Sequence, residues 1–168
     1  ARWDGAAWSP LGNLGASYSS VNALEALPDG SLVVGGDFEY AAEMWTPGLA
    51  LLKDSHWLPL SKGLNGPAFA AVSFGGGLAV GGSFAAAGGE VSRAIAYWDG
   101  SALHPFADGF DAPVLGLLAR SDGSLIAGGL FEHSGVIPLA RIARWNGVDW
   151  SPMGSGLNGA VYALAPAP

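Results

Sequence analysis

Histidine and carboxylate side chains are the groups in this chain with the most obvious potential for acid–base or metal chemistry. Catalysis and metal binding both require several such groups to converge on one point. The three histidines, His56, His104 and His133, fit no known order of a nucleophilic triad. The 14 acidic residues are scattered along the chain and form no D-x-D-x-D-G calcium loop. We therefore expect no catalytic residue, no metal site and no cofactor.

One catalytic alternative stays open at this point. Two carboxylates that meet across the folded chain could hydrolyse a glycosidic bond. No motif singles out such a pair, and the chain has no Cys for thiolate chemistry. Asp29 and Asp122 each stand in an Asp-Gly turn, where the side chain can bond its own backbone. A glycoside-active enzyme therefore ranks below a binding role.

Tryptophan is the other residue type that suggests a chemistry, because its flat ring can stack on a sugar. Six of the seven Trp residues recur in similar words of sequence, which predicts packing between neighbouring units instead. These six are Trp3, Trp8, Trp57, Trp98, Trp145 and Trp150. Trp45 has no equivalent in the other units. The repeat does not require Trp45, which makes it a candidate for binding.

A Gly-Gly pair at the end of an apolar run reveals an internal repeat. The runs are LVVGGDF at 32–38, LAVGGSF at 78–84 and LIAGGLF at 125–131. The pairs, which begin 46 and 47 residues apart, are Gly35 with Gly36, Gly81 with Gly82, and Gly128 with Gly129. No G-K-[ST] word follows them, so a phosphate loop is excluded. We expect them to allow close approach of strands near a central axis.

The sequence pattern in each unit of about 46 residues predicts four short strands. The first is apolar, the second carries the Gly pair, the third reads like ARWDG and the fourth like WSPLG. Asp-Gly turns at 29–30 and 122–123 predict hairpins between the first and second strands. The Ala-rich segment 83–89 contains paired Gly, which disfavours a helix there. The pattern predicts an all-β fold, a β-propeller of four-stranded antiparallel blades.

The chain accounts for roughly three and a half blades of a single propeller domain. The expected division is 1–20 as the third and fourth strands of a split blade, 21–67, 69–112 and 114–159 as blades, and 161–168 as the first strand of a split or next blade. A blade built from the two ends has no second strand, and unpaired edges invite other chains. We expect a fragment of a longer protein, or copies that complete one another as a ring or fibre.

The repeat resembles kelch repeats, in which an apolar run ending in Gly-Gly is followed by an aromatic residue and then by Trp. The last unit shows LIAGG, then Trp145 and Trp150. The first unit departs most, because Lys53 stands in the first aromatic position and one residue is missing before Trp57. The W-D-G words are similar to those of kelch-like propellers in large bacterial and fungal cell-surface proteins. The resemblance implies the fold and says little about function.

The segments between the second and third strands differ most between units, which favours them as binding loops. The resemblance implies that they share one face with the turns that lead into each next unit. The candidate ligand-face residues are Glu39, Tyr40, Glu43, Trp45, Glu90, Glu132 and His133.

Composition excludes several classes of partner. The net charge is −7, and the seven basic residues never cluster as a nucleic-acid binder requires. No apolar run reaches the roughly 18 residues of a membrane span, so we expect no membrane insertion. We expect an extracellular or bacterial cell-surface binding scaffold, not an enzyme, whose partners are a protein or glycan, further copies of itself, or the rest of a longer chain.

Overall fold

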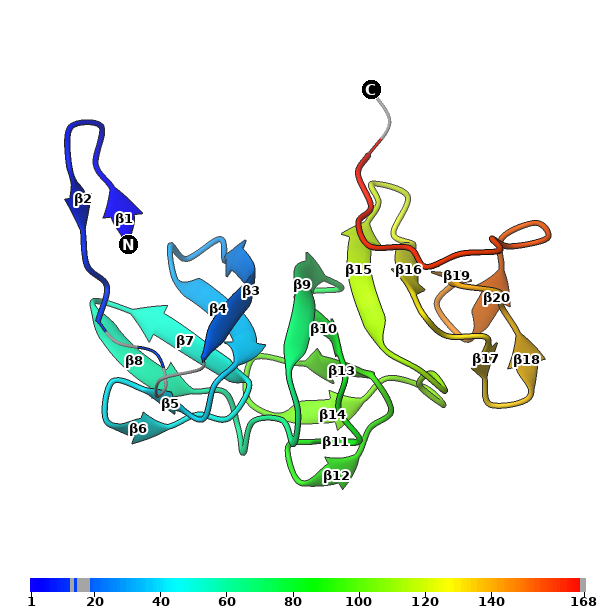
Figure 1. Ribbon diagram of the computed structural model, residues 1–168, viewed down its shortest axis with the longest axis horizontal. Coiled ribbons are helices and arrows are strands. Elements are labelled where there is room, and N and C mark those ends of the chain that lie inside the picture. Colours follow the sequence, from blue (N-terminus) through cyan, green and yellow to red (C-terminus); the bar gives the residue numbers. More distant parts are fainter. Residues whose placement is uncertain (13, 15–18, 167–168) are drawn as a thin grey trace.

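The structure is a computed structural model that describes residues 1–12, 14 and 19–166. In this part of the chain the fold is all-β, with no helix and with three four-stranded antiparallel sheets (Figure 1). The first sheet contains β3 (Ser20–Ala26), β4 (Leu32–Asp37), β7 (Leu49–Lys53) and β8 (His56–Pro59). The second contains β9 (Ala68–Phe74), β10 (Gly77–Gly82), β13 (Ile95–Trp98) and β14 (Leu103–Pro105). The third contains β15 (Val114–Ala119), β16 (Leu125–Gly129), β19 (Ile142–Trp145) and β20 (Trp150–Pro152).

Two-stranded hairpins accompany the sheets. One precedes them and pairs β1 (Arg2–Trp3) with β2 (Trp8–Ser9). The others lie between the second and third strand of each sheet, in segments expected to be plain loops. They are β5 (Tyr40–Ala41) with β6 (Met44–Trp45), β11 (Ala86–Ala87) with β12 (Glu90–Val91), and β17 (His133–Ser134) with β18 (Ile137–Pro138). The binding candidates therefore stand on hydrogen-bonded hairpins.

The second Gly of each pair permits a β-bulge between the first two strands of its own sheet. In all three sheets the register shifts at this point. A Cβ on Gly82 would lie 2.2 Å from the carbonyl oxygen of Pro67, and one on Gly36 or Gly129 would meet the matching carbonyl as closely. Because no side chain fits, the Gly is required by the backbone of its own sheet.

The first Gly of each pair makes close contact with the next unit. A Cβ on Gly35 would meet Ala68, one on Gly81 would meet Val114, and one on Gly128 would meet Val161. The same contact therefore joins the first sheet to the second, the second to the third, and the third to the segment after it. The strands β3, β9 and β15 lie beside one another (Figure 1) and, with 162–164, line a hollow of about 260 Å³.

Continuous apolar cores join consecutive sheets. One cluster spans the first two sheets and includes Leu60, Leu78 and Leu103. Another spans the second and third and includes Phe106 and Trp150. Leu11, Leu60 and Phe106 occupy the same position, three residues after Trp8, Trp57 and Leu103, and each belongs to the core that reaches the following sheet. The matching residue of the third sheet, Met153, is 36% exposed.

The W-D-G words form side-chain-capped turns between third and fourth strands. Asp99 Oδ1 accepts hydrogen bonds from the backbone N–H of Ser101 and Ala102, both at 2.8 Å. Asp4 and Asn146 cap their own turns in the same way. These hydrogen bonds lower the pKa of Asp99 below its ordinary value, and the bond from Ala102 has the largest effect. The turn thus explains the Asp or Asn that follows each Trp of these words.

The first sheet corrects two details of the sequence alignment. Leu32 pairs with Leu52, as Leu78 pairs with Trp98 and Leu125 with Trp145. The first aromatic position is therefore held by Leu52, not by Lys53, and no residue is missing before Trp57. Lys53 pairs with His56 across a two-residue turn, Asp54 and Ser55, in which both residues have positive φ. The spacing from Leu52 to Trp57 equals that in the other sheets, and only the turn between the strands is tighter. This turn, and not a deletion, altered the local sequence pattern.

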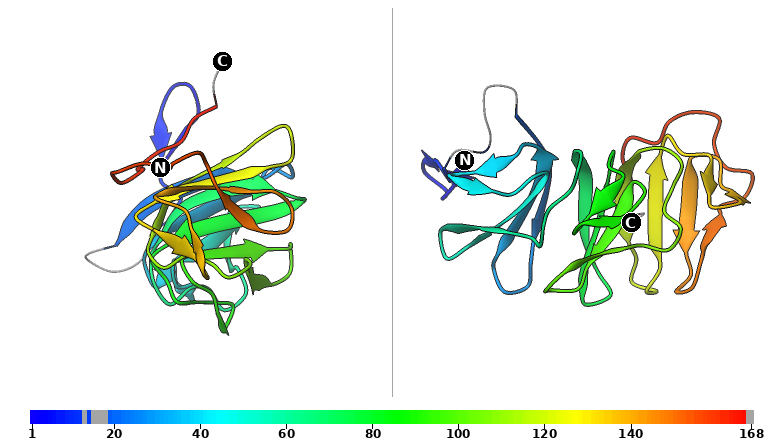
Figure 2. Two further views of the ribbon diagram at one scale, coloured as in Figure 1. Left: turned by 90° about the vertical axis from the view of Figure 1, so that its right-hand side faces the viewer. Right: turned by 90° about the horizontal axis from the view of Figure 1, so that it is seen from below.

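The expected strand at 161–166 is wrong, because the structure assigns no strand there. Val161 nevertheless lies where a first strand would begin. Its N–H donates to the carbonyl of Gly129 at 3.1 Å, and its side chain covers Gly128. A ladder needs a neighbour to pair with, and among the described residues no second strand follows. In the right view of Figure 2 the hairpin of β1 and β2 lies beside the first sheet, and this segment lies beside the third sheet.

The recurring Trp residues divide by their place in the array. Trp57 and Trp150 are buried between units, and Trp98 and Trp145 are half-buried. Trp3 and Trp8 are 51% and 69% exposed and pack on each other at 5.5 Å between ring centroids. Packing between units, expected for all six, is therefore absent at the first hairpin within the described part of the chain.

Candidate functional site

Three equivalent grooves lie on one face of the array. Each is formed where the hairpin inside one sheet meets the turn that leads to the next unit. Groove 1 has a volume of about 440 Å³ and is lined by residues of 36–48 and 62–66 together with Ala86 and Gly89. Groove 2 is lined by residues of 83–94 and 110–113, and groove 3 by residues of 132–141 with Leu157 and Asn158. The two kinds of segment expected to share a face do line common grooves.

Backbone hydrogen bonds close the base of each hairpin in the same way. The N–H of Thr46 donates to the carbonyl of Glu39 at 2.9 Å. Ser92 donates likewise to Ala85, and Leu139 to Glu132. This base fixes the residue at the start of the hairpin beside the residue at its end. In the first hairpin these are Glu39 and Thr46, and Trp45 directly precedes Thr46.

The connecting turn is clamped to the next hairpin by a side chain. Asn65 Oδ1 accepts from the N–H groups of Ala85 and Ala86, both at 2.8 Å. Asp111 does the same for Glu132 and His133. Burial raises the pKa of Asp111, but these backbone bonds and the His133 ring outweigh it, and the net pKa is lowered. The groove walls are therefore held by the fold before any ligand arrives.

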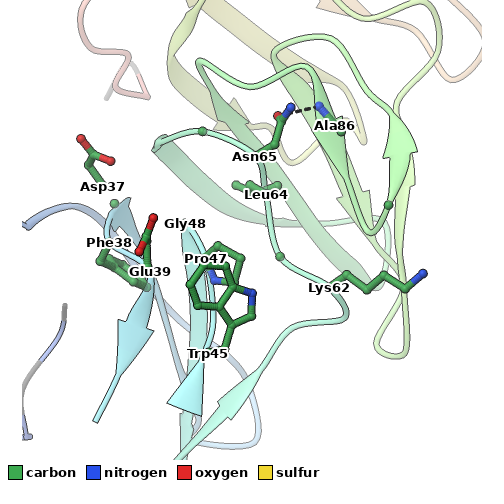
Figure 3. A pocket seen from close by; sticks show the side chains of 14 residues that line it. Asp37, Phe38, Glu39, Trp45, Pro47, Gly48, Lys62, Leu64, Asn65 and Ala86 are labelled. Carbon is green, nitrogen blue, oxygen red and sulfur yellow. Dashed lines mark hydrogen bonds between the residues drawn. The ribbon is translucent and has the colours of Figure 1, made fainter. Parts of the chain in front are cut away.

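Groove 1 carries the richest set of unpaired side chains (Figure 3). Trp45 is 53% exposed and meets Tyr40 edge-on, with ring centroids 5.0 Å apart and an angle of 80°. Asp37, Glu39 and Lys62 also line the groove. Among the described residues, none of these three side chains has an ion-pair or hydrogen-bond partner. Their charges are thus available to a ligand.

Groove 3 is occupied by its own ion pair and hydrogen bonds. Arg141 Nη2 lies 2.8 Å from Glu132 Oε1, and the guanidinium also donates to the carbonyl of Leu130. His133 Nδ1 lies 3.0 Å from Asp111 Oδ2. Charged groups that are already paired have less to offer an external ligand, so groove 3 is a poorer site than groove 1.

The seven ligand-face candidates do not converge on one site. Glu39 and Trp45 meet in groove 1, with Tyr40 behind Trp45, whereas Glu132 and His133 meet in groove 3. Glu43 lines a separate shallow hollow with Met44 and His56, and Glu90 lines none of the three grooves. Sequence reasoning missed Asp37, Lys62 and Asn65. The available signal was the repeated G-L-N-G turn, whose Asn position faces the next hairpin.

Several other acids serve turns or surface pairs. Lys53 Nζ lies 2.9 Å from Asp29 Oδ2, and this bond lowers the pKa of Asp29 to about 2. His104 pairs with Asp99 at 3.0 Å. Across the described residues, no three His, Asp or Glu side chains gather as metal ligands. The same part of the chain contains no helix long and apolar enough to cross a bilayer.

Comparison of the chain with protein-family models, with curated proteins and with solved structures gives no significant match. The grooves and the joints between sheets are therefore the features of the chain that indicate a function.

Proposed function

We propose that the chain is part of a kelch-like β-propeller that acts outside the cell as a non-enzymatic binding scaffold. The three sheets are its blades, and β3, β9 and β15 line its axis. Two observations support the propeller: the joint between consecutive sheets repeats residue for residue, and the first strands share one central hollow.

The observation that carries the binding role is the row of preformed grooves on one face. Their walls are hydrogen-bonded hairpins clamped by Asn65 and Asp111, whereas their linings differ from unit to unit. A constant frame with variable linings is the usual arrangement of a recognition surface. Within the described residues, the opposite face carries tight turns, such as 99–102 and 120–123.

Binding arrays with variants on the two faces test this function. We expect the immobilised chain to retain members of a glycan or peptide array, and Trp45→Ala combined with Glu132→Ala to remove the signal, because both residues line grooves. Arg120→Ala with Arg144→Ala, whose exposed side chains both pair with Asp122 by the turn at 120–123, is the matched control on the opposite face and should leave the signal unchanged. Loss of signal in the control alone would place binding on the wrong face and overturn the proposal.

Self-assembly is a second candidate function, favoured by the uncovered ends of the array. Val21 is 47% exposed, whereas the equivalent Ala68 and Val114 are fully buried by the Gly pair of the preceding unit. Leu24 on the same strand is 62% exposed. At the other end, Leu157 is 50% exposed, whereas the equivalent Leu64 is buried. One end thus displays the residues that enter a joint. At the other end Val161 of the same chain already covers Gly128, so a second copy would meet the exposed Leu157 and Met153, and copies would join head to tail through apolar surface.

Light scattering across a concentration series tests the assembly. If copies join through these ends, the chain of 17.0 kDa should give particles of two or more chains. Leu24→Glu should return them to single chains, because it buries a carboxylate in the joint. Val136→Glu, at a residue 94% exposed on the third hairpin, is the matched control and should assemble normally. Monomers at every concentration would rule out self-assembly.

A further inference from the structure

We propose that groove 1 is a saccharide-binding site that takes a neutral pyranose ring on the indole of Trp45. This inference rests on the proposed binding function and assigns its ligand class. The class is a β-linked glucan, because an all-equatorial pyranose presents a flat C–H face to an aromatic ring and a rim of hydroxyl groups to polar side chains.

Trp45 is positioned as a platform and not as a part of the core. The equivalent residues of the other hairpins are Val91 and Pro138, so no unit needs an aromatic ring here for its fold. The ring is nevertheless fixed, because Trp45 faces Tyr40 across the hairpin and the two rings pack edge to face. A large, rigid and half-exposed aromatic residue at the wall of a cavity is the usual signature of ligand contact.

Groove 1 differs from groove 3 by the loss of an internal cation. Glu39 and Glu132 occupy the same position at the start of their hairpins, each with its carbonyl bonded from the residue at the hairpin's end. Glu132 is held by Arg141 at 2.8 Å. The residue of the first hairpin that matches Arg141 is Gly48, which leaves space in the groove and leaves the Glu39 carboxylate without a described partner.

The polar lining offers both acceptors and donors. Asp37 and Glu39 are acceptors only, and Lys62 is a donor only. Asn65 Oδ1 accepts hydrogen bonds from the next hairpin, and the Nδ2 amide of Asn65 has no partner among the described residues. In Figure 3 Glu39 stands with Asp37 on one side of the groove, Leu64 and Asn65 stand across from them on the connecting turn, and Lys62 extends away from the ring of Trp45.

This mixed lining favours a neutral polyol over a cation. A hydroxyl group donates and accepts at once, so it satisfies both kinds of partner. An ammonium or guanidinium ligand would pair with the two carboxylates but would also be repelled by Lys62. The volume of about 440 Å³ lies within the usual range of small-molecule sites, roughly 300–1,000 Å³.

Titration calorimetry with cellohexaose tests the assignment. We expect the wild-type chain to bind it, and Trp45→Ala to weaken binding roughly tenfold or more. Trp8→Ala is the matched control, because Trp8 is also an exposed Trp but does not line groove 1, and the affinity of this variant should equal that of the wild type. Glu39→Gln should weaken binding less than Trp45→Ala. Affinity should not change with salt, since the ligand carries no charge.

Three outcomes would overturn the assignment. One is that the wild-type chain does not bind cellohexaose although its circular dichroism shows that it is folded. Another is an equal loss in Trp45→Ala and Trp8→Ala. The third is binding of an oligolysine peptide, but not of cellohexaose, with an affinity that falls as salt is raised, which would identify a cationic partner. In each case, array binding that still depends on the groove face would leave the proposed scaffold function standing.

Discussion

Phe106→Ala should lower the free energy of unfolding by about 3–5 kcal/mol, the range for removing a fully packed aromatic side chain. The Phe106 ring lies 4.9 Å from Trp145, 5.6 Å from Trp150 and 5.9 Å from Tyr97. It thus joins the second sheet to the third, and its removal leaves a cavity at the joint. Urea unfolding followed by Trp fluorescence measures the loss.

Met153→Ala is the matched control for this prediction. Met153 holds the same repeat position as Phe106, but no described unit covers it and it is 36% exposed. Truncation should therefore change the unfolding free energy by less than about 1 kcal/mol. Equal losses in the two variants would show that a further unit or a second copy covers Met153. A small loss in Phe106→Ala would contradict the joint itself.

The strands and their grouping followed from the sequence because their cause is local. A Gly pair needed by a bulge, an Asp that caps its own turn, and an apolar first strand each leave a residue-level mark. Trp145 and Trp150 could be assigned to paired strands from spacing alone, and β19 and β20 pair in this register. The alignment failed at Lys53 because a two-residue turn with positive φ replaces the capped turn without changing its length.

The groove could be predicted only in part. The sequence separated Trp45 from the structural Trp residues, because no equivalent exists elsewhere in the repeat. It did not show that Glu39 lies beside Trp45 while Glu43 turns to another hollow, because that depends on the hairpin pairing of β5 with β6. Lys62 and Asn65 belong to a distant turn, and only the packing of one sheet on the next brings them to the same cavity.

The joints also explain why the segment after Asn158 differs from the strands it resembles. Val114 and Val161 make the same contact with a Gly pair, yet only Val114 begins a strand. Docking on the preceding unit therefore positions the start of a first strand, and pairing with its own second strand forms the ladder. A first strand in this array therefore depends both on the preceding unit and on the second strand of its own sheet.

Gly82→Ala should be about as damaging as a large core truncation, although it removes no contact. The new Cβ would lie 2.2 Å from the carbonyl oxygen of Pro67, which accepts a hydrogen bond from the N–H of Ser83 at 2.9 Å. The first strand must move away, which strains the bulge and breaks this bond. Overpacking and the lost hydrogen bond together predict that the free energy of unfolding, measured in urea, falls by about 2–4 kcal/mol.

Gly159→Ala is the matched control, because a Cβ there meets nothing within 4 Å and φ is not positive. The stability of this variant should equal that of the wild type. If Gly82→Ala unfolds at the wild-type urea concentration, the strands do not approach as closely as the repeated Gly pair implies.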